Sequence, residues 1–369
     1  MLPLRIAHAQ VRSFRNLAHV DADFGERFNV VSGDNGQGKT NLLEALYVLA
    51  TSKSFRTSKP GDLVAFGGEL ASVRATVIEA DTSRVQSVGL RSGARLVRID
   101  EKRPPSLAAY AVRTPIVVFH PGELSLSMGA SSERRKLLDR TALYLAPASM
   151  GDLDSYARAV KARQKALETR GVNASDLPEW EALCVRHGTA VMEHRARGAE
   201  LLAQHAQVAF ERIAAPGLVL DVSYAPSAPR SAEDFAKELE RRRPADLRRG
   251  SATLGPHRDD LALAISGRPV RGVASQGQHR AVTLSLKSAE IDVIGNARGV
   301  RPILLLDDVS SELDRARTAA LFSFLRDQRG QVFLTTTRPE LIDTGDDGSR
   351  TDFVIDRGVL RASLRVVGG

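Results

Sequence analysis

The stretch Phe28-Asn29-Val30-Val31-Ser32-Gly33-Asp34-Asn35-Gly36-Gln37-Gly38-Lys39-Thr40 decides the fold. A short apolar run leads directly into a glycine-rich loop, and the residues after the loop repeat apolar side chains at helical spacing. The pattern Gly-x-x-x-x-Gly-Lys-Thr between a predicted strand and a predicted helix is a complete Walker A motif. Its glycines let backbone N–H groups converge on phosphate oxygens, with a helix N-terminus behind them.

This motif predicts a site for ATP with Mg²⁺. Lys39 would neutralise the β- and γ-phosphates and take part in catalysis, and Thr40 would bind Mg²⁺ through its hydroxyl group. A glycine-rich turn that matches by chance is the alternative, and the flanking strand and helix disfavour it. The predicted nucleotide-binding residues of the loop are Gly33, Asp34, Asn35, Gly36, Gln37, Gly38, Lys39 and Thr40.

A second apolar run, Ile303–Leu306, ends in Asp307 and Asp308, as a Walker B strand does. Asp307 would bind the Mg²⁺ or its water shell, and Asp308 would be the catalytic residue that polarises the attacking water. ABC-type ATPases usually have Glu at the second position, so Asp308 reaches one methylene less far. Alone, the run is as consistent with a buried strand that ends in two solvated carboxylates, and the Walker A motif decides between the two.

The segment Ser275-Gln276-Gly277-Gln278 opens a predicted helix between these motifs and is similar to the ABC signature sequence. In that superfamily the element contacts the γ-phosphate held by the opposite subunit, so Ser275, Gly277 and Gln278 are further predicted ATP ligands. Ser311–Asp314 stands where such proteins have the D-loop, and Thr335–Thr337 stands where many have a switch histidine. The missing histidine and Asp308 together predict slow hydrolysis and a switch that controls association.

The order of elements predicts an α/β fold: an ABC-type ATPase head, built of a P-loop mixed sheet plus an antiparallel β layer, with a compact inserted α-helical arm. Alternating runs between Ala71 and Asp100 predict the antiparallel layer. Apolar residues at helical spacing mark two arm helices, near 153–167 and 180–191, and neither sustains heptads. We assign residues 1–125 and 250–369 to the head and residues 126–249 to the arm. Ser231–Asp234 resembles a helix cap, and Pro244 is expected to end that helix.

Composition sets the class of partner. The 369 residues have a net charge of +8, which makes a polyanion plausible, and aromatic residues are 5% of the chain, which disfavours base stacking. The single Cys184 fits a reducing compartment and is expected to pack in a core. No apolar run is long enough to span a membrane, so we predict a cytoplasmic protein. Candidate DNA-binding clusters are Arg134–Lys136, Arg241–Arg243 with Arg248 and Arg249, and Lys53 with Arg56 and Lys59.

Beyond these motifs the chain resembles the RecF family of bacterial recombination and repair proteins, which is related to SMC proteins. Segments that carry the resemblance run from near the start to near the end: Phe14–Asn16, Gly33–Arg56, His120-Pro121, Gly129 with Arg134–Asp139, Thr253–Asp260, Ser275–Arg280 and Leu305–Asp314. Ser131 departs from the expected proline. The resemblance implies weak, DNA-stimulated ATP hydrolysis, ATP-dependent dimerisation on DNA, cooperation with RecO and RecR in loading RecA at single-stranded gaps, and support of replication and the SOS response.

Three alternatives are less consistent with the sequence. A transporter-type ATPase subunit would have a much shorter interval between Thr40 and Ser275, and a nuclease-coupled ABC ATPase would need a further acidic metal-binding domain after Thr337. A purely structural SMC-like tether would need long heptad-bearing helices. His257 and Arg258, after the turn at Gly255-Pro256, are expected to have a structural role.

Overall fold

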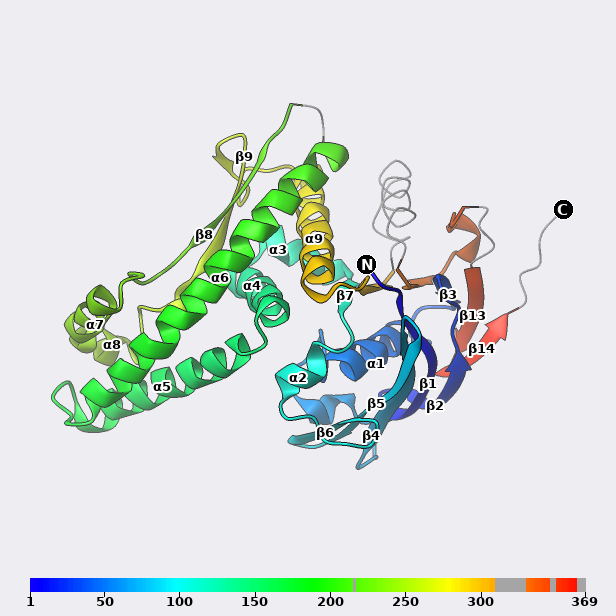
Figure 1. The fold of residues 1–369 in the computed structure, drawn as a ribbon, viewed down its shortest axis with the longest axis horizontal. Helices are drawn as coiled ribbons and strands as arrows, with labels where there is room; N and C mark the ends of the chain where they lie inside the picture. The colour runs from blue at the N-terminus through cyan, green and yellow to red at the C-terminus, as the bar shows by residue number, and fades with distance from the viewer. Residues whose placement is uncertain (215–216, 309–329, 346–349, 364–369) are drawn as a thin grey trace. The chain divides into compact units, whose positions relative to one another are not determined.

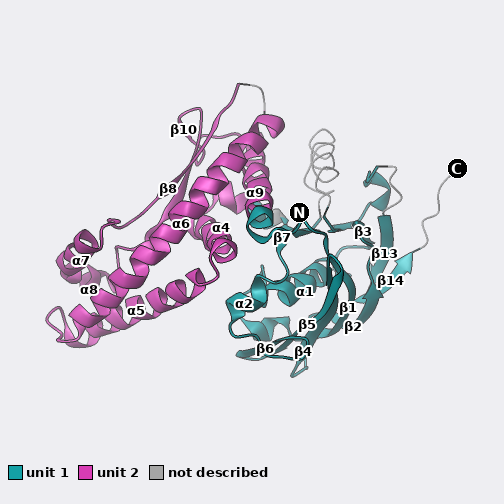
Figure 2. Cartoon of the chain, in the orientation of Figure 1, with its two compact units in different colours: residues 1–123, 294–369 teal, residues 124–293 magenta. Residues whose placement is uncertain are grey.

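The computed structural model describes residues 1–214, 217–308, 330–345 and 350–363 (Figure 1). The predicted D-loop segment Ser311–Asp314 lies outside the described residues. The chain divides into two compact units, which we describe separately (Figure 2): unit 1 comprises Met1–Glu123 with Ile294–Gly369, and unit 2 comprises Leu124–Val293.

Unit 1 contains a six-stranded sheet that holds both Walker motifs. Its order is β14 (Val359–Ser363), β13 (Arg350–Asp356), β3 (Phe28–Ser32), β12 (Val332–Thr336), β11 (Ile303–Leu306) and β7 (Ile116–Phe119). Every neighbouring pair is parallel except β13 with β14. Because β11 and β12 are buried along their whole length, they show continuous apolar runs rather than alternation. This confirms the strands expected from the apolar runs at residues 28–31 and 303–306.

An antiparallel five-stranded sheet forms the second layer of unit 1. Its order is β2 (Leu17–Asp23), β1 (Leu4–Phe14), β4 (Ala71–Glu79), β5 (Thr82–Arg91) and β6 (Ala94–Ile99), so the meander predicted within 71–100 is confirmed. Helix α1 (Lys39–Thr51) contacts strands of both sheets, and α2 (Leu107–Ala111) packs against it. Leu42, Leu46 and Leu49 of α1 are fully buried, and each such side chain stabilises the fold by about 1.5–3 kcal/mol.

Unit 2 is built on two long helices, α5 (Ser149–Arg170) and α6 (Leu177–Ile213), which form an antiparallel pair (Figure 1). The two predicted arm helices are therefore confirmed, but α6 has 37 residues and is about 55 Å long, much longer than its predicted segment. The other α-helices described in unit 2 are α3 (Ser125–Met128), α4 (Ser131–Leu145), α7 (Ala232–Arg241), α8 (Arg243–Arg249) and α9 (Gln276–Arg298). The last residues of α9 belong to unit 1.

The insertion also contains strands. Strands β8 (Leu220–Ala225), β9 (Asp260–Ile265) and β10 (Arg268–Pro269) form an antiparallel sheet of order β10-β9-β8. Since β9 pairs with β8, and Val282, Leu286 and Ala289 of α9 share a core with α4 and α6, residues 250–293 group with the arm elements rather than with unit 1. This differs from the sequence-based boundary at residue 250, and the assignment of that segment to an ATPase head remains a prediction.

Two local predictions concern the ends of α7. The Ser231 hydroxyl oxygen accepts a hydrogen bond from the Asp234 amide at 3.3 Å, as a helix cap does, which confirms the start of α7. The helix ends at Arg241, before Pro244 as expected, and Pro244 lies in the first turn of α8. Proline is tolerated there because the first N–H groups of a helix have no intrahelical partner.

Candidate nucleotide-binding site

The glycine loop between β3 and α1 has a backbone shape that only glycine accommodates easily. Gly38 caps α1 with φ 116°, in the left-handed region. At Gly33 a Cβ atom would lie 2.3 Å from the carbonyl oxygen of Ile355, because β13 passes directly beside the loop. The predicted loop residues from Gly33 to Thr40 are therefore together in one turn at the N-terminus of α1, where backbone N–H groups and the helix dipole favour an anion.

Lys39 folds back onto this loop. Its ammonium group donates hydrogen bonds to the carbonyl oxygens of Gly33 at 2.6 Å and Asp34 at 2.9 Å, and the residue is 7% exposed. Burial lowers the pKa of Lys39, while the carboxylates of Asp308, Asp307 and Asp34 act in the opposite direction. Because phosphate oxygens are stronger acceptors than carbonyls, a phosphate at the loop could replace these two bonds.

The two Walker motifs meet at Thr40 and Asp307. The Thr40 hydroxyl lies 2.9 Å from both carboxylate oxygens of Asp307. The contact arises because β3, β12 and β11 are parallel neighbours, so their carboxyl ends reach the same edge of the sheet. A hydroxyl and a carboxylate are hard oxygen donors that fit Mg²⁺, which in nucleotide sites takes its remaining ligands from water and phosphate.

Thr335, at the end of β12, joins the two aspartates. Its hydroxyl donates to an Asp307 carboxylate oxygen at 2.8 Å and accepts from the Asp308 amide at 2.9 Å. Asp308 itself has φ 50° and contributes the largest of the charges that act on the Lys39 pKa. The sequence led us to note only that Thr335–Thr337 lacks a histidine, so this role of Thr335 was missed; the strand order that creates it is not visible in the sequence.

Residues far away in the sequence hold the loop in place. The Asn16 side chain donates to the Gly36 carbonyl oxygen at 3.3 Å and accepts from Asn41 at 2.8 Å. On the other side, the amides of Arg357 and Gly358 donate to the Gln37 side chain at 2.6 Å and to its carbonyl oxygen at 2.9 Å. Neither supporting segment was predicted as part of the site, although Asn16 is within a segment that carries the family resemblance.

A buried carboxylate of α1, that of Glu44, binds side chains from the segments before and after the helix. Glu44 is fully buried and accepts hydrogen bonds from Arg15, Ser54 and Arg56. Arg56 also donates to Asn41 at 2.8 Å. In the candidate DNA-binding cluster of Lys53, Arg56 and Lys59, the Arg56 guanidinium is therefore bonded within the protein, because a carboxylate without a cation would be costly at this depth.

The signature-like segment is in unit 2, at the exposed start of α9. Its Ser275 amide donates to the Gln278 side chain at 2.8 Å, and the Gln278 amide donates back to the Ser275 hydroxyl at 3.3 Å. This reciprocal pair fixes the first turn in the manner of a capping box, and Ser275 is exposed. A joint role of Ser275, Gly277 and Gln278 with the glycine loop stays a prediction.

The cluster Arg134–Lys136 serves mainly to hold unit 2 together. Arg134 is buried and binds both carboxylate oxygens of Asp260, at 2.6 and 2.9 Å. Arg135 donates to the Ser131 hydroxyl and to the Asp259 carbonyl oxygen, each at 2.7 Å. These two arginines are therefore not a free surface for DNA, contrary to what their run in the sequence allowed.

His257 and Cys184 have structural surroundings. His257 accepts a hydrogen bond from the Tyr156 hydroxyl at 2.7 Å through Nδ1, and its Nε2 donates to the Ala252 carbonyl oxygen at 3.1 Å. Cys184 is buried in a cluster with Tyr156, and burial raises the pKa of its thiol to about 12. Both observations agree with the structural roles expected from the sequence.

Comparisons with known proteins cover nearly the whole chain. The family model described as RecF/RecN/SMC N terminal domain matches residues 5–356. The chain is 35% identical to the DNA replication and repair protein RecF of Geobacter sp. (strain M21), over 96% of this chain and 99% of that protein. It is 36% identical to the protein of the same name from Anaeromyxobacter sp. (strain Fw109-5), over 97% of this chain and 99% of that protein.

Solved structures agree with the sequence comparison. A structure titled as the recombination mediator protein RecF with ATPrS in the RecFOR pathway superposes with a TM-score of 0.90 at 28% identity, over 98% of this chain and 99% of that one. The Smc head domain derived from Pyrococcus furiosus gives a TM-score of 0.54 at 16% identity over 98% of this chain and 96% of that one, which shows a shared fold. Among the described residues, no helix is both long and apolar enough to cross a membrane.

Proposed function

Because the chain belongs to the RecF family of DNA replication and repair proteins, we propose that it is an ATP-controlled clamp on DNA. It has the fold of an ATPase head and binds ATP at the glycine loop. ATP binding in turn controls dimerisation. In this proposal hydrolysis is slow, stimulated by DNA, and resets the clamp.

One observation supports this proposal most strongly: Lys39, Thr40 and Asp307 meet at the N-terminus of α1. Lys39 exchanges its two carbonyl partners for the β- and γ-phosphates, and Thr40 with Asp307 holds the Mg²⁺. The metal supplies charge neutralisation at the phosphate oxygens when bound. Asp308 accepts a hydrogen bond from the attacking water and so orients it, with Lys39 stabilising the charge that develops.

The exposed start of α9 supports the dimeric part of the proposal. The amides of Ser275 and Gln278 are bonded within the helix tip, and the Gly277 amide, which has no acceptor within the helix in this first turn, suits a γ-phosphate. We place this tip against the nucleotide held by a second copy, so that neither copy completes the site alone. Dimerisation and hydrolysis are then coupled.

The cellular role follows from the family. The relatives are DNA replication and repair proteins, and the solved RecF structures are of a recombination mediator protein in the RecFOR pathway. We propose that this chain acts in the cytoplasm with RecO and RecR to promote RecA loading at single-stranded gaps. DNA binding is independent of base sequence in this proposal, since the few aromatic residues favour contacts to the phosphate backbone, which carry no sequence information.

Sedimentation velocity with and without ATP tests the clamp. The wild type should become dimeric only with ATP; Lys39→Arg should weaken this response, because its planar guanidinium does not fit the compact ammonium position. Asp308→Asn should bind ATP, fail to hydrolyse it and remain dimeric. The control Lys59→Arg makes the same change on an exposed lysine and should behave as the wild type. Equal dimer content of the wild type under both conditions would refute the clamp.

A further inference from the structure

A basic hollow lies on the surface of unit 2, on helix α8. It has a volume of about 570 Å³ and is lined by Arg242, Ala245, Arg248, Arg249 and Thr253. Helix α8 packs beside the turn between α5 and α6, where Leu247 contacts the apolar cluster that contains Leu167 and Leu177. Three arginines thus line a single surface hollow.

Helix electrostatics favour this arrangement. Arg248 and Arg249 are in the last turn of α8, where the helix dipole favours cations. Both are exposed, and within the described part of the chain neither forms a hydrogen bond or an ion pair. Arg242 caps the C-terminus of α7 and directly precedes α8, so the dipole of α7 rather than that of α8 favours its charge, and it lines the same hollow. The hollow therefore combines cations from both ends of α8.

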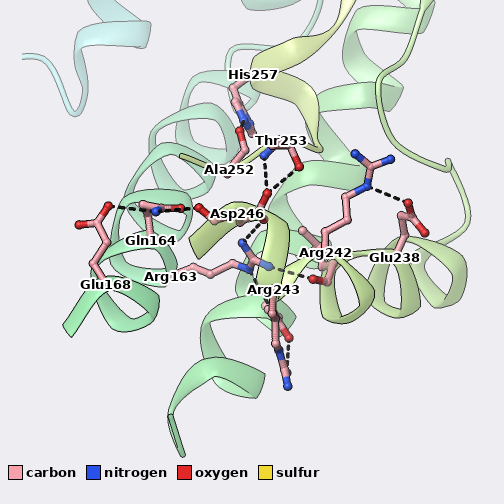
Figure 3. Close-up of polar contacts among 12 residues, drawn as sticks. Arg163, Gln164, Glu168, Glu238, Arg242, Arg243, Asp246, Ala252, Thr253 and His257 are labelled. Carbon is pink, nitrogen blue, oxygen red and sulfur yellow. Dashed lines mark hydrogen bonds and ion pairs between the residues drawn. The ribbon is translucent and has the colours of Figure 1, made fainter. Parts of the chain in front are cut away.

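Buried bonds fix the position of α8 (Figure 3). The Asp246 carboxylate is fully buried, accepts from Arg163 at 2.7 Å through one oxygen, and accepts from the Thr253 amide and hydroxyl at 2.8 and 2.6 Å through the other. Arg163 in turn donates to Glu181 at 3.0 Å. Since Thr253 also lines the hollow, the same network that anchors α8 fixes part of its wall.

Arg242 is oriented from its inner side. Its Nε donates to Glu238 at 2.8 Å, which leaves the two terminal nitrogens of the guanidinium available (Figure 3). Hydrogen bonds from Arg241 and Arg242 lower the pKa of Glu238 to about 2, so this carboxylate stays charged at neutral pH. Glu240 is engaged with Arg243 at 3.5 Å. Glu238 and Glu240 are therefore paired with arginines, and in the described part of the chain no carboxylate is bonded to Arg248 or Arg249.

We propose that this hollow binds the sugar–phosphate backbone of DNA, with residues other than those of the nucleotide site at the glycine loop. The inference rests on the proposed function, since it takes DNA as the ligand. The lining has no aromatic or large apolar side chain that could hold a base or anchor a peptide, whereas guanidinium groups bind phosphate oxygens bidentately. The hollow would recognise phosphate groups, so its contacts would not distinguish one base sequence from another.

The test compares two charge-matched double variants of the full chain. Arg248→Gln with Arg249→Gln removes the unpaired cations of the hollow. Arg212→Gln with Arg268→Gln removes two exposed cations at the other end of unit 2, near the C-terminus of α6 and in β10. Binding to a gapped DNA duplex is measured by fluorescence anisotropy over a series of salt concentrations, with inorganic phosphate and ATP as competitors in separate arms.

The hollow variant should bind DNA about tenfold more weakly than the wild type, with a salt slope reduced by about 0.9 for each phosphate that the protein no longer neutralises. ATP binding and thermal unfolding should be unchanged, the control should bind as the wild type, and millimolar phosphate should not compete. Equal losses of DNA affinity in both variants, or no loss in either, would contradict DNA binding by the hollow while leaving the proposed ATP-controlled DNA binding intact. Competition by inorganic phosphate would show that the hollow is a site for the free anion and would also contradict the proposal. A wild type that binds no DNA would overturn the proposed function as well.

Discussion

Two buried cations, Lys39 of unit 1 and Arg195 of unit 2, are bonded in opposite ways. In unit 1, the Lys39 ammonium donates to the carbonyl oxygens of its own loop. In unit 2, Arg195 is bonded to the carboxylates of Asp139 and Asp259. A cation that is hydrogen-bonded only to neutral carbonyls can move to an anionic ligand at small cost. A cation bonded to buried carboxylates cannot, because their negative charge would be left without a partner. The bonding partner thus separates a ligand-binding cation from a structural one.

The network around Arg195 shows how far the structural type extends. Its guanidinium binds both oxygens of Asp139, at 2.7 and 3.0 Å, and donates to Asp259 at 3.0 Å. Asp259 also accepts from the Tyr224 hydroxyl and, at 2.8 Å, from the Ser227 amide. This network joins α4, α6, β8 and the turn before β9, so it holds several elements of unit 2 in one arrangement.

The largest expected effect therefore comes from Arg195→Leu. The variant leaves the buried Asp259 and the partly buried Asp139 without their cation and should lose about 3–5 kcal/mol of unfolding free energy. Urea unfolding, monitored by circular dichroism, measures this loss of unfolding free energy. Arg197→Leu is the matched control, because it makes the same change at an exposed position of the same helix and should stay within about 0.5 kcal/mol of the wild type. Similar losses in both variants would contradict the structural role of the network.

Lys39→Met tests the other side of the comparison. It should weaken ATP binding about a hundredfold, equivalent to about 2.8 kcal/mol, because the phosphates lose their buried cation. The unfolding free energy should change by less than about 1 kcal/mol, since the lysine is bonded to carbonyls that can bind water instead. Calorimetry with ATP and urea unfolding measure the two quantities, with Lys59→Met as the exposed control. A loss of several kcal/mol in stability would place Lys39 among the structural cations.

Features that depend on neighbouring residues were predictable from the sequence. The glycine loop, the Walker B strand and the Ser231 cap each arise from side chains within a few positions of one another, and their chemistry is local. The assignment of Lys39, Thr40 and Asp307 to one site needed only the motif order, because the carboxyl ends of parallel strands meet at one edge.

Features that depend on strand order and tertiary packing were not predictable. Thr335 reaches Asp307 only because β12 lies beside β11, and Asn16 reaches the loop only because of how β1 and β2 pack. The run Arg134–Lys136 has the composition of a DNA-binding patch, yet Asp260, far along the chain, binds Arg134. A run of arginines and lysines in a sequence therefore predicts a DNA-binding surface only when it is known which carboxylates, distant in the sequence, bind the same side chains.

The smallest expected effect is a dependence of stability on pH at His257, whose sequence neighbour Pro256 accepts a hydrogen bond from Arg195. Burial lowers the pKa of His257 below 6.5; the Ala252 carbonyl and Asp259 oppose this, and Arg258 and Arg135 add to it. The Tyr156 hydroxyl faces its other nitrogen. Since the folded pKa is below the unfolded value, the unfolded chain takes up the proton first. Stability is full above about pH 6.5 and falls as the pH drops below it.

For one proton, the slope of this loss is at most about 1.4 kcal/mol per pH unit. Urea unfolding of the full chain between pH 5 and pH 8 should show it in the wild type. His257→Gln offers one acceptor and one donor at all pH values, so its stability should fall less steeply below pH 6.5. His19→Gln, on an exposed position of unit 1, should keep the wild-type slope. Equal slopes for all three chains would show that the neutral histidine contributes nothing, and that the charged pairs alone hold unit 2 together as the pH falls.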